Sequence, residues 1–246
     1  MSDNLLSEKL NDYTGWFTQA GRCLEKRRSR YQDIDAYDID LHLVYADLSH
    51  DFALFTLGAN YYFADAKLGG DSFLELNQAS LYAGKLFGDA WYVRGALNFT
   101  EKEFDTFDTR DADNDGFAVD LYRFFNGGRS NVTVGYVYEE EDTRGQAFRY
   151  TADSLRLRLN HRFTLAERPS RLQLGYRWQQ RDYRFPTPVI NVPRDDRPRV
   201  MEAQLEVEMT DTLALTTGWE HGDYRSRLPS ADFSANRYSM ALKLSF

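Results

Sequence analysis

NRYSMALKLSF, residues 236–246, alternates from Arg237 onward between large apolar side chains and polar or small ones. Its apolar positions are Tyr238, Met240, Leu242, Leu244 and Phe246. Successive side chains of a β-strand point to opposite faces, so a period of two predicts a strand with one apolar face and one polar face.

The same period recurs along most of the chain. SLRLRLNHRF (154–163), RLQLGYRWQQR (171–181) and VMEAQLEVEM (200–209) each place leucine or other apolar residues on one face and charged or amide residues on the other. A helical period is nearly absent from about residue 34 onward. We therefore predict an all-β chain with strands at 34–46, 51–63, 73–86, 90–102, 116–125, 130–140, 152–164, 170–182, 197–209, 212–224 and 235–246.

Two features indicate what the apolar faces contact. Most segments have the roughly 9–11 residues that a tilted membrane-crossing strand needs. Leucine and valine lie mid-strand, whereas aromatic residues lie toward the ends, as in the girdles of transmembrane barrels. These aromatic residues are Trp91, Phe99, Tyr136, Tyr138, Trp178, Trp219, Tyr238 and Phe246.

The connections alternate between short stretches such as DLSHD (47–51) and long polar stretches such as FADAKLGGDSF (63–73) and FPTPVINVPRDDRPR (185–199). Short periplasmic turns and long extracellular loops are typical of outer-membrane barrels. We predict a closed antiparallel transmembrane β-barrel located in the bacterial outer membrane. If the chain ends at the periplasmic side, every short turn falls inside and every long loop outside.

Antiparallel closure favours an even number of strands, so one more strand is expected before residue 34. DYTGWFTQAGRCLE (12–25) can supply it, which gives about twelve strands and two periplasmic termini. The domain organisation would then be a periplasmic tail at 1–11 and a barrel at 12–246. A plug segment or a short helix is the alternative interpretation of residues 1–25.

Composition limits the other classes of function. The net charge of -8 argues against nucleic acid as a partner, and the single cysteine, Cys23, excludes an internal disulfide. No apolar run is long enough for a transmembrane helix. The polar, acidic start Met1-Ser2-Asp3-Asn4 does not look like a signal peptide.

The C-terminal stretch resembles the signal that the barrel-assembly machinery recognises in Gram-negative outer-membrane proteins. Tyr238, Ala241, Leu244 and Phe246 stand at the positions of that pattern. The resemblance implies insertion beside phospholipid and lipopolysaccharide, with the assembly machinery as a partner.

A second resemblance covers the later part of the chain. It is carried by DLYRFFNGGRSNVTVGYVYEEEDTRGQAF (120–148), RDDRPRVMEAQLEVEMTDTLAL (194–215) and SRLPSADFSANRYSMALKLSF (226–246). These stretches are similar to the barrel domains of surface lipoprotein assembly modifiers and of export porins linked to tetratricopeptide repeats. The resemblance implies an export conduit with a periplasmic or exported partner, but this chain has no room for the repeats.

Charges are unevenly distributed over the predicted inward faces. The basic residues are Arg156, Arg158, Arg162, Arg171, Arg177 and Arg181, and the acidic residues are Asp38, Asp40, Glu139, Glu141, Glu202, Glu206 and Glu208. His42 lies with the first two aspartates. In one interpretation these charges face a water-filled pore and select polar, acidic solutes such as sugar acids, or polymers. In the other, they neutralise one another between strands and fill a narrow barrel.

The stretch DTRDADNDGFAVDL (108–121) begins like an EF-hand calcium loop. Counting from Asp111, however, the twelfth position is Tyr122, where an EF-hand requires glutamate. We interpret the stretch as the descending side of an extracellular loop. Asp111, Asp113 and Asp115 remain candidate ligands for a surface Ca²⁺, and no other cofactor is expected.

Catalysis is not expected. Of the histidines His42, His50, His161 and His221, only His221 lies near an acidic residue at the outer end of a strand, and parity directs both His221 and Asp223 outward. The sequence thus favours a channel, porin-like or for export. The alternatives are a hydrolase with a site at the outer rim and a closed structural or adhesive barrel.

Overall fold

The computed structural model describes residues 8–11, 17–29 and 38–244. These residues form one antiparallel sheet whose thirteen strands follow chain order. The strands are β1 (Glu8–Asn11), β2 (Phe17–Ser29), β3 (Ile39–Asp51), β4 (Thr56–Leu68), β5 (Asp71–Phe87), β6 (Trp91–Phe104), β7 (Ala112–Phe125), β8 (Ser130–Thr143), β9 (Tyr150–Leu165), β10 (Arg168–Thr187), β11 (Val192–Glu208), β12 (Leu213–Ser226) and β13 (Phe233–Leu244). No helix in these residues is long and apolar enough to cross a membrane.

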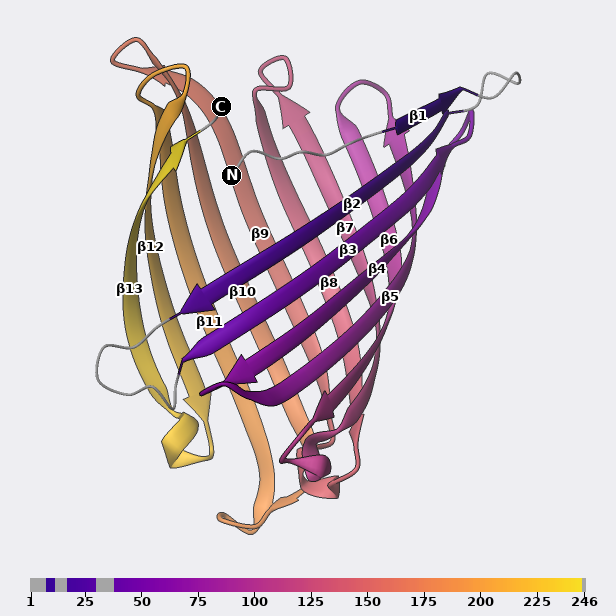
Figure 1. Ribbon diagram of the computed structural model, residues 1–246, viewed down its shortest axis with the longest axis vertical. Helices are drawn as coiled ribbons and strands as arrows, with labels where there is room; N and C mark the ends of the chain where they lie inside the picture. The colour runs from indigo at the N-terminus through magenta and orange to yellow at the C-terminus, as the bar shows by residue number, and fades with distance from the viewer. Residues whose placement is uncertain (1–7, 12–16, 30–37, 245–246) are drawn as a thin grey trace.

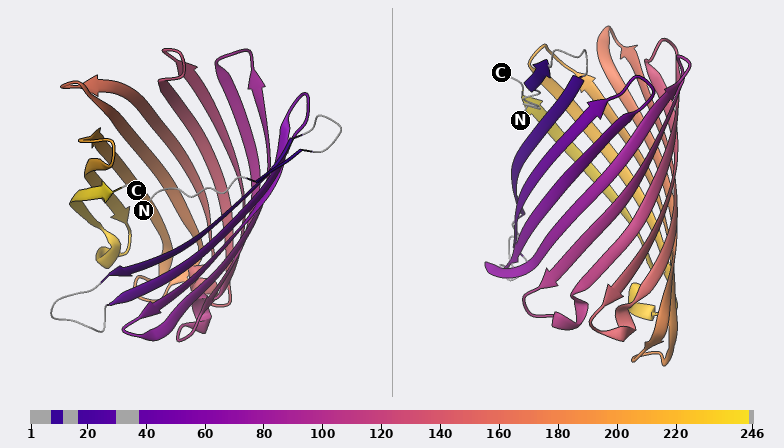
Figure 2. Two further views of the ribbon diagram at one scale, coloured as in Figure 1. Left: turned by 45° about the horizontal axis from the view of Figure 1, so that its top comes forward. Right: turned by 90° about the vertical axis from the view of Figure 1, so that its right-hand side faces the viewer.

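The sheet curls on itself, so that β2–β5 lie opposite β9–β12 (Figures 1 and 2). One end, the short-turn rim, carries the connections 52–55, 88–90, 126–129, 166–167 and 209–212. The opposite end, the loop rim, carries 69–70, 105–111, 144–149, 188–191 and 227–232. Three single-turn 3₁₀ helices lie at the loop rim: η2 (Asp108–Arg110), η3 (Gln146–Phe148) and η4 (Pro229–Ala231).

Most strands are longer than a membrane crossing requires. Apart from β1, they contain between 12 and 20 residues, against the roughly 9–11 that span a bilayer. The additional length comes from stretches predicted as long loops. β4 continues to Leu68 and turns back at Gly69 and Gly70, which both have positive φ. β10 and β11 likewise absorb most of 185–199, so the prediction of long extracellular loops is wrong for these two connections.

The predicted turn at 47–51 is also wrong. β3 continues through Asp51, and the turn lies at 52–55, where the Phe52 N–H donates to the Phe55 carbonyl. Asp47 is a mid-strand residue whose carboxylate accepts a hydrogen bond from the Tyr82 hydroxyl. An acidic side chain with a hydrogen-bonding partner inside the barrel looks the same in sequence as a turn residue.

The number of strands and their closure differ from prediction. The four-residue β1 lies in the predicted tail and pairs with Phe17–Ala20 of β2, which makes thirteen strands rather than about twelve. Residues 12–16 of the predicted first strand lie outside the described residues, and β2 continues beyond it to Ser29. Within the described parts of the chain, no backbone pairing joins β13 to β1 or β2. The predicted closure is therefore not seen.

Cross-strand registers assign one face of the sheet to apolar residues. Leu81, Leu97, Phe117, Leu157 and Trp219 lie on this face, and each is more than a third exposed. Only five apolar residues of the described chain are buried: Ala64, Ala112, Tyr150, Ala152 and Val200. A soluble protein would bury its leucines, so this arrangement is that of a sheet whose apolar face contacts hydrocarbon.

The opposite face is the inner one. On it, side chains of next-nearest strands reach one another, as Tyr82 of β5 reaches Asp47 of β3. Side chains converge on the concave side of a curled sheet and diverge on its convex side. Polar residues therefore line the interior of the curl.

We predict that charge is tolerated inside and not outside. Leu157→Arg places a cation on the outer face and should lower the free energy of unfolding in lipid vesicles by about 2–4 kcal/mol. Asn160→Arg places the same side chain on the inner face of the same strand and should cost far less. Denaturant titration in vesicles measures both, and equal losses would contradict the assignment of faces.

Candidate functional site: a charged cavity on the inner face

A cavity of about 740 Å³ lies on the inner face between β6 and β12. Its charged lining residues are Arg94, Asp120, Arg156, Arg158, Arg177, Glu202 and Glu220. Tyr122, Asn131, Thr133 and Asn160 add neutral polar groups. Seven strands thus contribute to one hydrophilic interior surface.

The charges follow two adjacent rows of cross-strand neighbours. The first row is Arg94, Asp120, Gly135, Arg156, Arg177 and Val200, from β6 to β11. The second row is Tyr122, Thr133, Arg158, Gly175, Glu202, Glu220 and Arg237, from β7 to β13. The next row toward the short-turn rim is neutral and includes Asn131, which accepts from the Asn160 amide at 3.0 Å.

Two ion pairs in these rows skip a strand, whereas Arg237 pairs with its direct neighbour Glu220 at 2.8 Å. Arg156 Nη2 lies 3.1 Å from Asp120 Oδ1, across Gly135 of β8. A Cβ at Gly135 would overlap Asp120 Oδ1, so the absence of a side chain there permits the pair. Arg158 Nη2 lies 3.7 Å from Glu202 Oε1 across Gly175 of β10, where a Cβ would overlap that oxygen.

Arg177 has a different environment. Its direct cross-strand neighbours are Arg156 and Val200, and it has no carboxylate partner among the described residues. Like charges directly opposite one another destabilise a sheet. Asp120 pairs with Arg156 and Glu202 pairs with Arg158, so the guanidinium of Arg177 is left exposed to the cavity.

The inner face of β3 and β5 places two tyrosines around the carboxylate of Asp47. The Tyr82 hydroxyl donates to both oxygens of Asp47, at 3.0 and 3.1 Å, and the Tyr45 hydroxyl donates to the same carboxylate. The Arg94 guanidinium lies 4.2 Å from the centroid of the Tyr82 ring. Arg94 thus joins this part of the inner face to the cavity.

A second polar cluster lies nearer the loop rim. Glu141 accepts from Lys102 and, at 2.8 Å, from the Tyr150 hydroxyl. Arg181 stacks at 4.3 Å over the Tyr150 ring. Glu139 of the same strand accepts from Gln179 at 3.4 Å. These contacts cross the inner face between β6 and β10.

The remaining predicted charges lie toward the short-turn rim. Arg162 and Arg171 are direct neighbours on β9 and β10, and Glu206 is the neighbour of Arg171 on β11. Glu208 lies two residues further along β11 on the same face. All six predicted arginines and the five predicted glutamates share the inner face.

The prediction for the acidic residues near the start is wrong. The register places Asp40 and His42 with Val44 and Leu48 on the outer face, where His42 Nδ1 lies 3.7 Å from Asp65 Oδ2. Asp38 immediately precedes β3. The inner face of β3 carries Tyr45 and Asp47 instead, because the turn at 52–55 shifts the paired register.

Sequence reasoning also missed three residues of the cavity. Arg94, Asp120 and Glu220 each occupy a polar position in an otherwise alternating strand. The alternation of polar and apolar residues in these strands was the signal that could have identified the three residues. Each is an isolated charge, whereas most of the predicted residues stand in runs of like charge along a strand.

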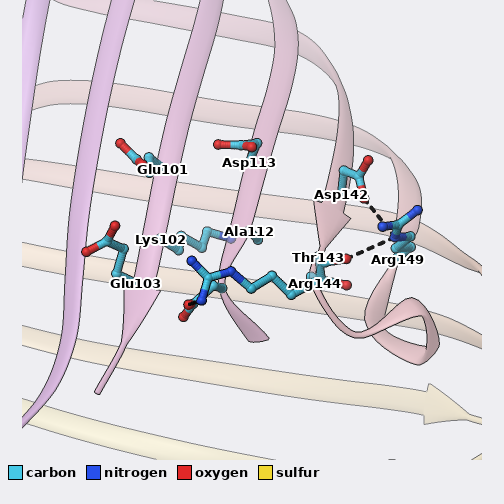
Figure 3. Close-up of a pocket in the computed structure, with 10 residues that line it drawn as sticks. Glu101, Lys102, Glu103, Ala112, Asp113, Asp142, Thr143, Arg144 and Arg149 are labelled. Atoms are coloured by element: carbon cyan, nitrogen blue, oxygen red, sulfur yellow. Dashed lines mark hydrogen bonds and ion pairs between the residues drawn. The ribbon is translucent and has the colours of Figure 1, made fainter. Parts of the chain in front are cut away.

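The predicted calcium site is not assembled among the described residues. Figure 3 shows the pocket that Asp113, Asp142 and Arg144 line. Asp111 pairs with Arg144 at 2.7 Å and accepts from the Phe104 N–H. Asp113 and Asp115 belong to β7 and face outward. In the chain as described, no group of three or more histidine, cysteine or acidic side chains is placed to hold a metal ion.

Within the described residues, neither His161 nor His221 forms a triad with a hydroxyl and a carboxylate. His221 Nδ1 lies 3.1 Å from Asn236 Oδ1 on the outer face. His161 Nδ1 lies 2.8 Å from Ser130 Oγ, but Ser130 is 0% exposed and cannot reach a substrate. These contacts are structural in character.

Comparisons with known proteins show the fold. No family model and no curated protein sequence matches the chain. Among solved structures, CdiB from Acinetobacter baumannii has a TM-score of 0.60 and 12% identity, over 96% of this chain and 52% of that one. A loop L8 deletion mutant of OmpT, an outer membrane protein of Vibrio cholerae, has a TM-score of 0.53 and 10% identity, over 94% and 90%.

The siderophore receptor PirA from Acinetobacter baumannii has a TM-score of 0.53 and 10% identity, over 92% of this chain and 41% of that one. This chain thus spans about half the length of the CdiB structure and less of PirA. The chain has the fold of the outer-membrane β-barrels, as predicted from its alternation.

We predict that Gly135 is required for the coupling of Asp120 and Arg156. In a double-mutant cycle with Asp120→Asn and Arg156→Gln, the coupling free energy should be about 0.2–1 kcal/mol, because the pair is partly exposed. In a Gly135→Ala background the added methyl displaces the carboxylate, and the coupling should vanish.

Gly95→Ala is the matched control, since a Cβ there meets nothing within 4 Å. Coupling should persist in that background. Unfolding in lipid vesicles gives the free energies, and coupling that survives Gly135→Ala would show that the glycine is incidental.

Proposed function

We propose that this protein is a passive channel of the outer membrane with a charge-zoned lumen, passing polar, acidic solutes or polymers. The observation that carries the proposal is the cavity of about 740 Å³ in which Arg177 has no carboxylate partner. An unpaired guanidinium facing water is a site for a passing anion. Its planar fork binds carboxylate or phosphate through two parallel hydrogen bonds.

The separation of basic and acidic residues onto different strands supports selection by charge. β9 and β10 carry three of the four arginines that line the cavity, Arg156, Arg158 and Arg177, and β11 and β12 carry Glu202 and Glu220. Opposed zones produce a field across the lumen, which orients a solute that bears both carboxylate and hydroxyl groups. Neutral donors such as Asn131 and Asn160 adjoin the charged rows and suit the hydroxyls of a sugar acid.

A closed structural barrel is the second candidate. The ion pairs Arg156–Asp120 and Arg158–Glu202 cross the inner face and occupy part of the interior. If such pairs fill the lumen, the protein would act through its loop rim and not through a pore. Conductance separates the two candidates, because only an open lumen gives current steps.

The proposal includes an orientation. We place the loop rim outside the cell and both termini in the periplasm, with the outer face of β13 (Tyr238, Leu244) presented to the assembly machinery together with Ala241 and Phe246. Phe246 lies outside the described residues. We propose transport and not hydrolysis as the activity.

Arg177→Ser should shift ion selectivity. In planar bilayers with a salt gradient, we expect the wild-type channel to prefer anions. Replacing this unpaired guanidinium should lower the anion-to-cation permeability ratio about twofold or more. Arg184→Ser is the matched control, because Arg184 lies on the outer face and pairs with Glu140 at 2.6 Å.

A channel without selectivity change in Arg177→Ser would remove this residue from the mechanism. Absence of any current steps from folded wild-type protein would instead favour the closed structural barrel. Heat-modifiable migration in gels verifies folding in either case.

We also propose that β13 closes the barrel against β2. β1 occupies the free edge of β2 only at Phe17–Ala20, so the edge from Gly21 to Ser29 remains for pairing. β2 and β13 are antiparallel by chain order, as closure requires.

Cys23, the single cysteine, lies within that edge. Cysteine placed in turn at each position from 237 to 243 should give an intramolecular disulfide with Cys23 at one or two adjacent positions under mild oxidation. Mass spectrometry of peptides from the folded protein detects the link. A scan without any intramolecular disulfide would show that the seam stays open.

A further inference from the structure

The outer face carries a groove that the apolar band does not fill. Its volume is about 460 Å³, and it lies across β4–β7. Apolar side chains form its sides: Leu57, Leu81, Leu97, Phe117 and Val119. All of them lie on the outward face of their strands.

The floor of the groove is made of small residues. Leu57, Ala83, Gly95 and Val119 are cross-strand neighbours in one row, and the middle two contribute a methyl group and no side chain. A Cβ at Gly95 would meet nothing within 4 Å. The hollow is therefore open on its outer side and has the apolar lining that suits a hydrocarbon chain.

Two cations lie between this groove and the short-turn rim. Lys85 follows Ala83 on the outer face of β5, and its ammonium lies 5.2 Å from the Phe87 ring centroid. Arg123 follows Leu121 on the outer face of β7, and its guanidinium lies 4.9 Å from the Trp91 ring centroid. Both side chains are exposed.

Neither cation is neutralised. Within the described residues, neither Lys85 nor Arg123 forms an ion pair with a carboxylate, whereas outer-face arginines near the loop rim do. Arg184 pairs with Glu140 at 2.6 Å, and Arg225 pairs with Asp223 at 3.1 Å. The two unpaired cations flank β6 from either side, one and two rows below the groove floor.

We propose that this surface binds one anionic phospholipid of the inner leaflet. An acyl chain lies in the groove over Ala83 and Gly95, and the phosphate lies between Lys85 and Arg123. The aromatic rings of Phe87 and Trp91 hold the cations at the level of the lipid headgroups, where aromatic side chains are normally enriched. The inference rests on the proposed membrane orientation but not on conduction.

The positive charge of Lys85 and Arg123 favours an anionic phospholipid over other occupants of the groove. The phosphate diester of a phospholipid carries the negative charge that pairs with Lys85 and Arg123. The acyl chain of the same lipid fits the apolar groove. A second copy of the chain presenting its own outer face would bring the same two cations to the contact and would repel. An anionic phospholipid satisfies both halves of the surface.

The test is native mass spectrometry of the full chain, released from detergent micelles containing phosphatidylglycerol and phosphatidylcholine in equal amounts. We expect the wild type to retain one phosphatidylglycerol. Lys85→Gln/Arg123→Gln should lower that retained fraction roughly 10-fold or more, because each cation near a lipid headgroup contributes substantially to binding. Arg184→Gln/Arg225→Gln removes two outer-face cations that are already paired and should retain the lipid.

A second variant tests the groove without altering charge. Gly95→Leu fills the hollow and has room to do so, so the barrel should fold and yet retain about 10-fold less phosphatidylglycerol, on the scale of a buried apolar chain segment. Equal retention by wild type and the Lys85/Arg123 double variant would overturn the proposal. Equal retention of both lipids by wild type, or dimers that exclude lipid, would overturn it as well.

These outcomes are independent of channel activity. Lipid retention is measured on the folded barrel whether or not it conducts. A protein that retains phosphatidylglycerol through Lys85 and Arg123 but gives no current steps would support this inference and contradict the proposed channel.

Discussion

The structure depends on one constraint: in hydrocarbon, the backbone has no water to satisfy its hydrogen-bonding groups. Each unsatisfied N–H or C=O costs several kcal/mol there, so every strand that meets lipid must be paired on both edges. The thirteen-stranded ladder meets this requirement from β3 to β12. β2 from Gly21 to Ser29 and the whole of β13 are paired on one edge only, and the residues of β13 from Phe233 to Met240 are all exposed. The same pairing fixes the period of two, because once the ladder is set, alternate side chains must face lipid and interior.

Much of this fold could be predicted from alternation alone. In β9, β10 and β11 the apolar and charged positions separate without exception over long stretches, and the predicted inner arginines and glutamates all share one face. The physical reason is strong: shifting a strand by one residue would turn every leucine inward and every arginine toward lipid. The alternation within such a strand is enough to assign which of its side chains face lipid and which face the interior.

The prediction failed where local chemistry was ambiguous. Asp47 resembles a turn residue, yet it is held within the barrel by Tyr82, and this error displaced the turn and assigned Asp38, Asp40 and His42 to the wrong face. Polar stretches predicted as loops proved to be strands that continue beyond the apolar band, because water satisfies their outer side chains as readily as it would a loop. Ion pairs that cross an intervening strand also could not be predicted from the sequence. Arg156 meets Asp120 because Gly135 lies between them, and no spacing in the sequence indicates that contact.

In the proposed orientation, with the loop rim outside the cell, the length of the strands has a consequence for the cell surface. β10, with 20 residues at about 3.4 Å each, far exceeds the bilayer, so the sheet continues into the medium beyond it. The connections at that end are short, such as Gly69–Gly70 and 188–191, and a protease requires a mobile, extended segment to enter its cleft. What the exterior meets is therefore mainly the ladder itself, rigid and already hydrogen-bonded. Antibodies or phage proteins that recognise this surface would have to bind a conformational epitope spread over several strands, and no single linear peptide would reproduce it.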